Sequence, residues 1–190
     1  MPLNFTTAIA QVCDDMTRRV AELSHIDMRL VAVGFRQARV KATHGVHASL
    51  TPLRFEQGTE RKKLRGRWYA CPRLVGDDGV ERLYLLQFYL PRFMDVPLEE
   101  KLTTIAHELW HISPQMDGDL RRMEGRCYAH GHSQKAFDAH AARLARAWLA
   151  ADPPAGLYEF LEPSFAELAT QHAGVTGVRY TVPKLAPIAA

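Results

Sequence analysis

The spacing of apolar positions divides the first third of the chain into one helix followed by strands. Between Phe5 and Leu23 the apolar residues recur at helical spacing, which predicts a helix that covers the core. These positions are Ile9, Val12, Cys13, Met16, Val20 and Leu23. Met28 to Val40 and Val46 to Phe55 then have strand character, and Thr43-His44-Gly45 between them predicts a hairpin turn.

A second hairpin is predicted around Gly76-Asp77-Asp78-Gly79, which separates Trp68 to Val75 from Val80 to Leu90. From Leu83 to Leu90 the residues are apolar on both faces. Such a strand has at least one face buried in the domain, and its other face is covered or used.

Two longer helices follow the strands. Pro97 to Ser113 is amphipathic and carries acidic residues in its first turn, where the helix dipole favours them. Gln115 to Tyr128 is polar and contains glycine, so we expect a loop. The next helix is expected to begin with Ser133 as its N-cap and to run to about Ala150.

Asp152-Pro153-Pro154 marks a boundary between two parts of the chain. We expect a domain over residues 1–150 and a C-terminal extension over residues 151–190. In the extension, the capping box formed by Ser164 and Glu167 predicts a short helix, and the proline-containing end is expected to be extended or loose. Together the elements predict an α+β fold with a small antiparallel or mixed sheet.

The helix from Pro97 to Ser113 contains the sequence His107-Glu108-Leu109-Trp110-His111. Residues four apart on a helix lie about 40° from each other, so both imidazoles point the same way and can bind one metal ion. Glu108 then lies close enough to reach a metal-bound water. The apolar residues of this helix cluster on one face, and the two histidines lie near the opposite pole. Histidines buried for packing would share the apolar face, so the pattern favours a metal site over a solvated polar surface.

Catalytic zinc is held by three protein ligands, so a third is needed. The segment Ala129-His130-Gly131-His132-Ser133 supplies the best candidates, since a ligand just before a helix N-cap is held by a rigid element. We expect His132 to be the third ligand, with His130 as the main alternative. Asp117 is a weaker candidate, because Pro114 restricts the turn that precedes it. Glu124 is weaker still, because it lies only thirteen residues after His111, which is short for a ligand supplied by a second helix.

The motif helix, together with Gly131-His132 and Phe137 at the start of the next helix, resembles the SprT-like, Spartan-type zinc metallopeptidases, and more closely the small metallopeptidase domains of this type in bacteria and phages. The resemblance covers about Met28 to Ala150, although only the two helices match specifically. It implies a zincin-like minimal metallopeptidase fold, in which a small sheet packs on an active-site helix and a second, ligand-bearing helix.

The same resemblance implies Zn²⁺ as cofactor, His132 as third ligand and Glu108 as general base. It further implies a substrate lying extended along a strand edge, for which we nominate Val80 to Leu90. A group that stabilises the carbonyl oxygen is also required, and Arg126, Tyr128 and His130 are candidates. The chain departs from Spartan in two ways: the spacing from Gly-His to the aromatic residue is one longer, and no Cys-x-x-Cys zinc ribbon follows the domain.

Composition favours a cytoplasmic protein. The first twenty residues lack a basic start followed by an apolar run, and no apolar stretch is long enough to span a membrane. The three cysteines are widely separated and form no Cys-x-x-Cys pair, as expected of reduced thiols. The net charge of +3 does not by itself imply nucleic acid, although Arg61 to Arg67 carries five basic residues in seven.

The leading hypothesis from the sequence is therefore a zinc-dependent peptidase that acts on a protein or peptide substrate. The alternative is a binding module on the same scaffold, with structural or vestigial zinc, that holds a protein or DNA partner through the basic stretch. A protein that binds no metal and contains the motif by chance is a third possibility. The sequence does not specify an oligomeric state.

Overall fold

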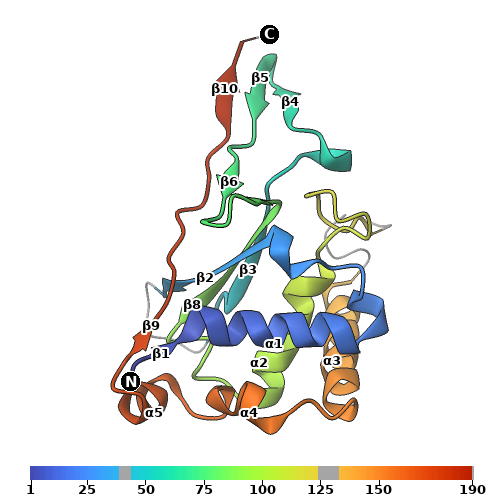
Figure 1. The fold of residues 1–190 in the computed structure, drawn as a ribbon. Helices are drawn as coiled ribbons and strands as arrows, with labels where there is room; N and C mark the ends of the chain where they lie inside the picture. The colour runs from blue at the N-terminus through green and yellow to red at the C-terminus, as the bar shows by residue number, and fades with distance from the viewer. Residues whose placement is uncertain (39–43, 124–132, 190) are drawn as a thin grey trace.

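The computed structural model describes residues 1–38, 44–123 and 133–189. Its central sheet has the strand order β2-β8-β3, with β2 over Val31–Gln37, β8 over Tyr84–Leu90 and β3 over Ala48–Pro52 (Figure 1). Strand β8 pairs in parallel with β2 and antiparallel with β3. The central position of β8 explains why its sequence is apolar on both faces.

The hairpin predicted between Met28–Val40 and Val46–Phe55 is wrong. Strands β2 and β3 form in these segments, but β8 lies between them and pairs with both. Alternating apolar residues predict that a segment forms a strand, but they do not specify which other strand pairs with it. The apolar strand β8 takes the centre, where both of its faces are covered.

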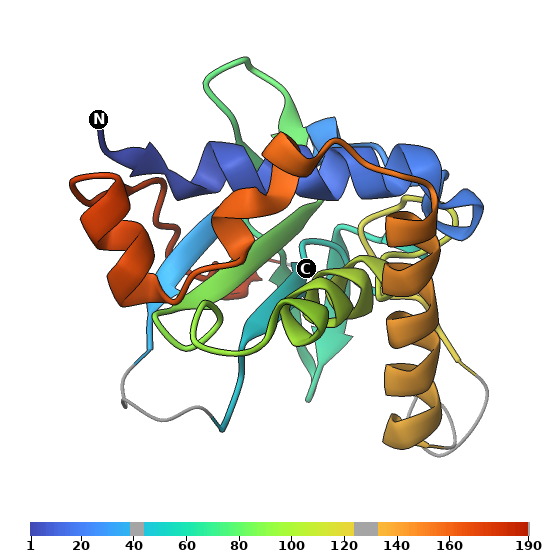
Figure 2. The ribbon, with the colours of Figure 1, turned by 90° about the horizontal axis from the view of Figure 1, so that it is seen from below.

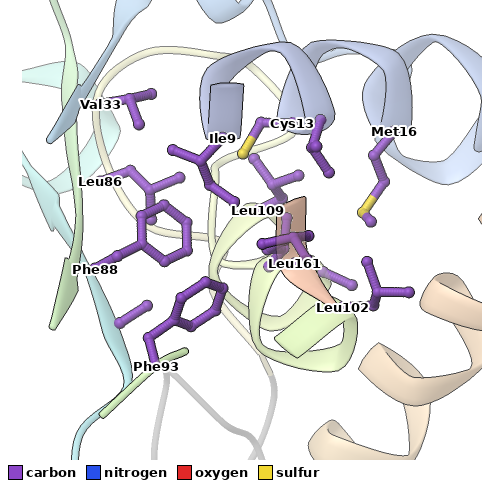
Figure 3. Packing of buried hydrophobic residues seen from close by; sticks show 14 of the residues in the cluster. Ile9, Cys13, Met16, Val33, Leu86, Phe88, Phe93, Leu102, Leu109 and Leu161 are labelled. Atoms are coloured by element: carbon purple, nitrogen blue, oxygen red, sulfur yellow. The ribbon is translucent and has the colours of Figure 1, made fainter. Parts of the chain in front are cut away.

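Two helices cover one face of this sheet. Helix α1, Phe5–Arg19, is capped by Asn4 and buries four of the predicted apolar positions, Ile9, Val12, Cys13 and Met16. It ends earlier than predicted: Val20 and Leu23 are also buried, but Val20 follows the helix and Leu23 lies in a short 3-10 turn at Ala21–Leu23. Helix α2, Leu98–Trp110, packs its apolar face against α1 and the sheet. Figure 3 shows Ile9, Cys13 and Met16 of α1 meeting Leu86 of β8 and Leu102 of α2 in one core.

Helix α3, Gln134–Ala150, begins after Ser133, whose side chain accepts a hydrogen bond from the backbone N–H of Ala136, as predicted. It lies beside α2 (Figures 1 and 2). From the sequence, His140 is expected to be a hydrogen-bonded histidine of the core, because it shares the apolar face of this helix. It is instead partly exposed and lies against Trp110, with the two tilted rings 4.4 Å apart between centroids.

The segment after residue 150 shares the core with the segment before it. It contains α4 at Ala155–Tyr158 and α5 at Phe165–Gln171, and the predicted capping box of Ser164 and Glu167 is confirmed. Leu161, which precedes α5, is fully buried in the common core. The buried Lys101 of α2 donates hydrogen bonds to the carbonyl oxygens of Leu161 and Pro163, at 2.6 and 3.0 Å.

The C-terminal tail runs along the outer edge of β2 and continues into a separate sheet. Phe35 of β2 donates a backbone hydrogen bond to the carbonyl of Val178. The tail then forms β10, Ala186–Ile188, which pairs with β5 in the strand order β10-β5-β4. This three-stranded sheet projects from the body and is called the arm below (Figure 1).

Strands β4 and β5 of the arm span Arg61–Leu64 and Arg67–Ala70. The predicted hairpin around Gly76 to Gly79 is confirmed in a short form. The remaining strands form two small pairs: β1 at Leu3–Asn4 with β9 at Val175–Thr176, and β6 at Leu74–Val75 with β7 at Glu81–Arg82. The fold is thus α+β, and within the described part of the chain no helix has the length and apolar character that crossing a bilayer requires.

Candidate metal centre

The last turn of α2 brings the two motif histidines together. The Nε2 atoms of His107 and His111 are 3.1 Å apart. Two nitrogens that each lie about 2.0–2.1 Å from a tetrahedral zinc ion are separated by about 3.3 Å. The spacing of the two imidazoles therefore fits a shared zinc ion.

Helix α3 supplies a carboxylate that fixes the orientation of one of these rings. The Nδ1 atom of His107 lies 3.0 Å from Oδ1 of Asp138, and Gln134 donates a hydrogen bond to the same oxygen at 2.9 Å. A carboxylate that accepts the second N–H of a histidine leaves Nε2 as the metal-binding atom. Phe137 lies beside both rings, with centroids 4.7 Å from His107 and 4.6 Å from His111.

The side chain of Glu108 extends from α2 to strand β3. This side chain is largely buried, and this burial raises the pKa of the carboxyl to about 7, although a hydrogen bond from the backbone N–H of Leu50 acts in the opposite direction. A carboxyl with a pKa near neutrality can both accept and release a proton at physiological pH. The geometry and the pKa both suit a general base.

These groups line one open pocket of about 700 Å³. One wall is formed by β3 and the residues before it, the second by α2, and the third by Gln134 and Asp138 of α3. His47 belongs to the first wall, 3.5 Å from Glu100 of α2. From the sequence alone, His47 is expected to be a surface residue and not a ligand, because the flanking sequence shows no further metal-binding partners.

Three of the four candidates for the third ligand, Glu124, His130 and His132, lie outside the described residues, as do Arg126 and Tyr128. The fourth, Asp117, lines a different pocket, where its carboxylate accepts the backbone N–H of Asp119 at 3.1 Å. No three His, Cys, Asp or Glu side chains in ranges 1–38, 44–123 and 133–189 are arranged to hold a metal. Asp117 therefore does not join the two histidines, because the turn after Pro114 directs it elsewhere.

The nomination of Val80 to Leu90 as the substrate strand is wrong, because β8 has partners on both edges. Strand β3 lies at the edge of the central sheet and borders the pocket. His47 and Leu53 flank β3: the carbonyl of His47 accepts a hydrogen bond from the backbone N–H of Tyr89 in β8, and Leu53 donates one to the carbonyl of Leu83, just before β8. By the antiparallel alternation, Ala48 and Leu50 direct their backbone groups away from β8.

Asp138 and His47 are site residues that the sequence did not identify. Asp138 is the fifth residue of α3 and follows Phe137 directly, and its closeness in sequence to the predicted ligand His132 was the one available signal. Comparisons of the chain with protein-family models, curated proteins and solved structures find no match. The geometry of the site therefore carries the functional argument.

Proposed function

We propose that this protein is a zincin-like, zinc-dependent peptidase. The observation that carries the proposal is the pair of imidazoles, which lie one helical turn from each other with their Nε2 atoms 3.1 Å apart. A buried glutamate lies between this pair and the edge strand β3. A structural zinc site is closed, with four protein ligands, and does not require a buried carboxyl beside an open pocket.

His107 and His111 would hold the zinc ion, with His132 as the proposed third ligand. His132 precedes the N-cap Ser133, and Gln134 lines the same pocket as both histidines. When bound, zinc supplies Lewis-acid polarisation of the scissile carbonyl and makes water a usable nucleophile near neutral pH.

Glu108 would act on the attacking water. Its carboxylate takes the proton as the water oxygen forms a bond to the peptide carbon, and the same carboxyl then delivers that proton to the nitrogen of the departing amine. The Leu50 N–H keeps the carboxylate oriented between these two transfers.

Strand β3 would bind the substrate backbone. The Leu50 N–H is used by Glu108, which leaves the N–H and C=O of Ala48 and the C=O of Leu50 for an extended peptide. A peptide that adds to a strand edge gains main-chain hydrogen bonds whatever its sequence, and side-chain pockets then give specificity. Protein or peptide substrates therefore suit this pocket better than small molecules.

The test compares the wild-type chain with Glu108→Gln and His111→Ala. We expect one zinc ion per wild-type chain by elemental analysis, and hydrolysis of an unstructured protein such as casein. Glu108→Gln keeps zinc and loses at least about 100-fold in hydrolysis, the contribution typical of a general base. His111→Ala loses zinc and activity together. Full hydrolysis by Glu108→Gln, or absence of zinc from the wild type after incubation with the metal, would contradict the proposal.

A further inference from the structure

The arm concentrates positive charge. Arg61, Lys62, Lys63, Arg65 and Arg67 lie on β4, β5 and the turn between them, and Lys184 lies just before β10. The segments 61–70 and 184–188, which form the arm, contain no acidic residue. Glu56 approaches Lys62 at 3.6 Å, whereas no carboxylate in the described part of the chain pairs with the four arginine and lysine residues Arg61, Lys63, Arg65 and Arg67. This charge is therefore available to an anionic partner.

The register of the arm places aromatic rings among these cations. Lys63 pairs with Trp68 and Arg61 with Ala70, so the side chains of Arg61, Lys63 and Trp68 share one face. The guanidinium of Arg61 lies 6.0 Å from the centre of the Trp68 ring. On the opposite face, Lys62 pairs with Tyr69. Both faces thus combine cations with an aromatic ring.

The arm lies apart from the pocket of the metal centre. No residue of β4, β5 or β10 lines that pocket, and Figure 1 shows the arm projecting beyond the central sheet, away from α2 and α3. Its β10 strand comes from the far end of the sequence and leaves β4 as an outer strand. A ligand on the arm would therefore leave the pocket open.

We propose that the arm binds single-stranded nucleic acid, with Arg61 and Lys63 contacting phosphates and Trp68 stacking on a base. Cations alone would suit any polyanion. An aromatic ring set between them suits a strand whose bases are unpaired, because a base can then lie flat on the ring while the phosphates reach the cations. A duplex keeps its base faces stacked inside and cannot use the ring in this way. This binding does not depend on the proposed peptidase activity.

The test measures binding of the full chain to a fluorescein-labelled oligothymidylate of about 16 nucleotides, the upper range for one such binding module. Anisotropy titrations at salt concentrations between about 50 and 200 mM give both the affinity and its salt dependence. Arg61→Ala/Lys63→Ala should bind more weakly, and the slope of log K against log salt should become shallower by about 1.4, the value for two phosphate contacts on a single strand. The matched control Arg18→Ala/Arg146→Ala removes two exposed cations from α1 and α3 and should change neither quantity.

Trp68 supplies a second, independent readout. Stacking on a base should quench part of the tryptophan fluorescence, and Trp68→Phe should lose that change while it keeps most of the affinity. Trp68→Ala should weaken binding by roughly 5- to 100-fold. Zinc content and peptide hydrolysis should be unaltered in Arg61→Ala/Lys63→Ala, which separates this test from that of the metal centre.

Several results would overturn the proposal. Binding by Arg61→Ala/Lys63→Ala equal to that of the wild type would remove the arm from the interaction. Equal competition by duplex DNA, inorganic polyphosphate or anionic vesicles, without quenching that depends on Trp68, would show a general polyanion surface. Parallel titrations with oligouridylate distinguish RNA from DNA as the source of the same chemistry.

Discussion

Asp138 shows how a single residue outside the motif can fix the ring orientation of a motif histidine. Its carboxylate lies 3.0 Å from Nδ1 of His107, which leaves Nε2 directed toward His111. The pairing crosses from α3 to α2, so helix packing and ligand orientation depend on each other. The histidine spacing alone makes a metal site possible, whereas Asp138 holds one ring in the orientation that the proposed zinc binding would require.

We expect Asp138→Asn to weaken zinc binding by about 10- to 100-fold, because the amide holds the His107 ring less firmly and makes it a weaker ligand. Competition with a chromophoric chelator measures the affinity directly, without any assay of hydrolysis. Asp117→Asn is the control, since Asp117 lines a different pocket. Unchanged zinc affinity in Asp138→Asn would remove this residue from the site.

His25 predicts a pH dependence of stability. Burial, together with the nearby charge of Arg121, lowers the pKa of His25 in the folded protein. Between this lowered pKa and the unfolded value of about 6.5, the unfolded chain binds more protons, so stability rises with pH across this window and levels off above it. Urea denaturation of chelator-treated protein at several pH values should show this rise, and His25→Gln should make it smaller. An identical pH profile in the variant would exclude His25 as a cause.

At the scale of elements, the edge position of β3 leads to a test of substrate binding. Ala48→Pro removes a backbone N–H that points away from β8, a place where an edge strand tolerates proline. We expect kcat/KM for an unstructured peptide to fall by about 2- to 10-fold, the equivalent of one hydrogen bond. Ala48→Gly, which keeps the N–H, is the control, and both variants should retain zinc. Equal loss in the two variants would assign the effect to the side chain instead.

The helices could be predicted from sequence more completely than the strand pairing. Apolar spacing and capping residues located α1, α2, α3 and α5, because a helix forms its hydrogen bonds locally. The pairing of β2 and β3 with β8 joins segments far apart in the chain, and no local pattern specifies it. His47 and Asp138 were missed for the same reason, since each reaches the pocket only through long-range packing.

At the scale of the whole molecule, residues after 150 and before 150 contribute to one core. Leu161→Ala should lower the free energy of unfolding by about 2–5 kcal/mol, because Leu161 is fully buried and the variant leaves a cavity. Denaturant titrations followed by tryptophan fluorescence and by circular dichroism should show one shared transition. Leu149→Ala, at a position that is 38% exposed, should cost much less. Two separate transitions would instead indicate that the C-terminal segment unfolds by itself.

The third strand of the arm has a consequence for biosynthesis. Strand β10 pairs with β5 across more than a hundred intervening residues, so a ribosome makes every helix of the body before it makes this strand. Until then the nascent chain carries only the β4-β5 ribbon, and an isolated two-stranded hairpin is marginally stable in water. A ligand that binds only the complete three-stranded arm can therefore bind only after the ribosome has synthesised the rest of the protein.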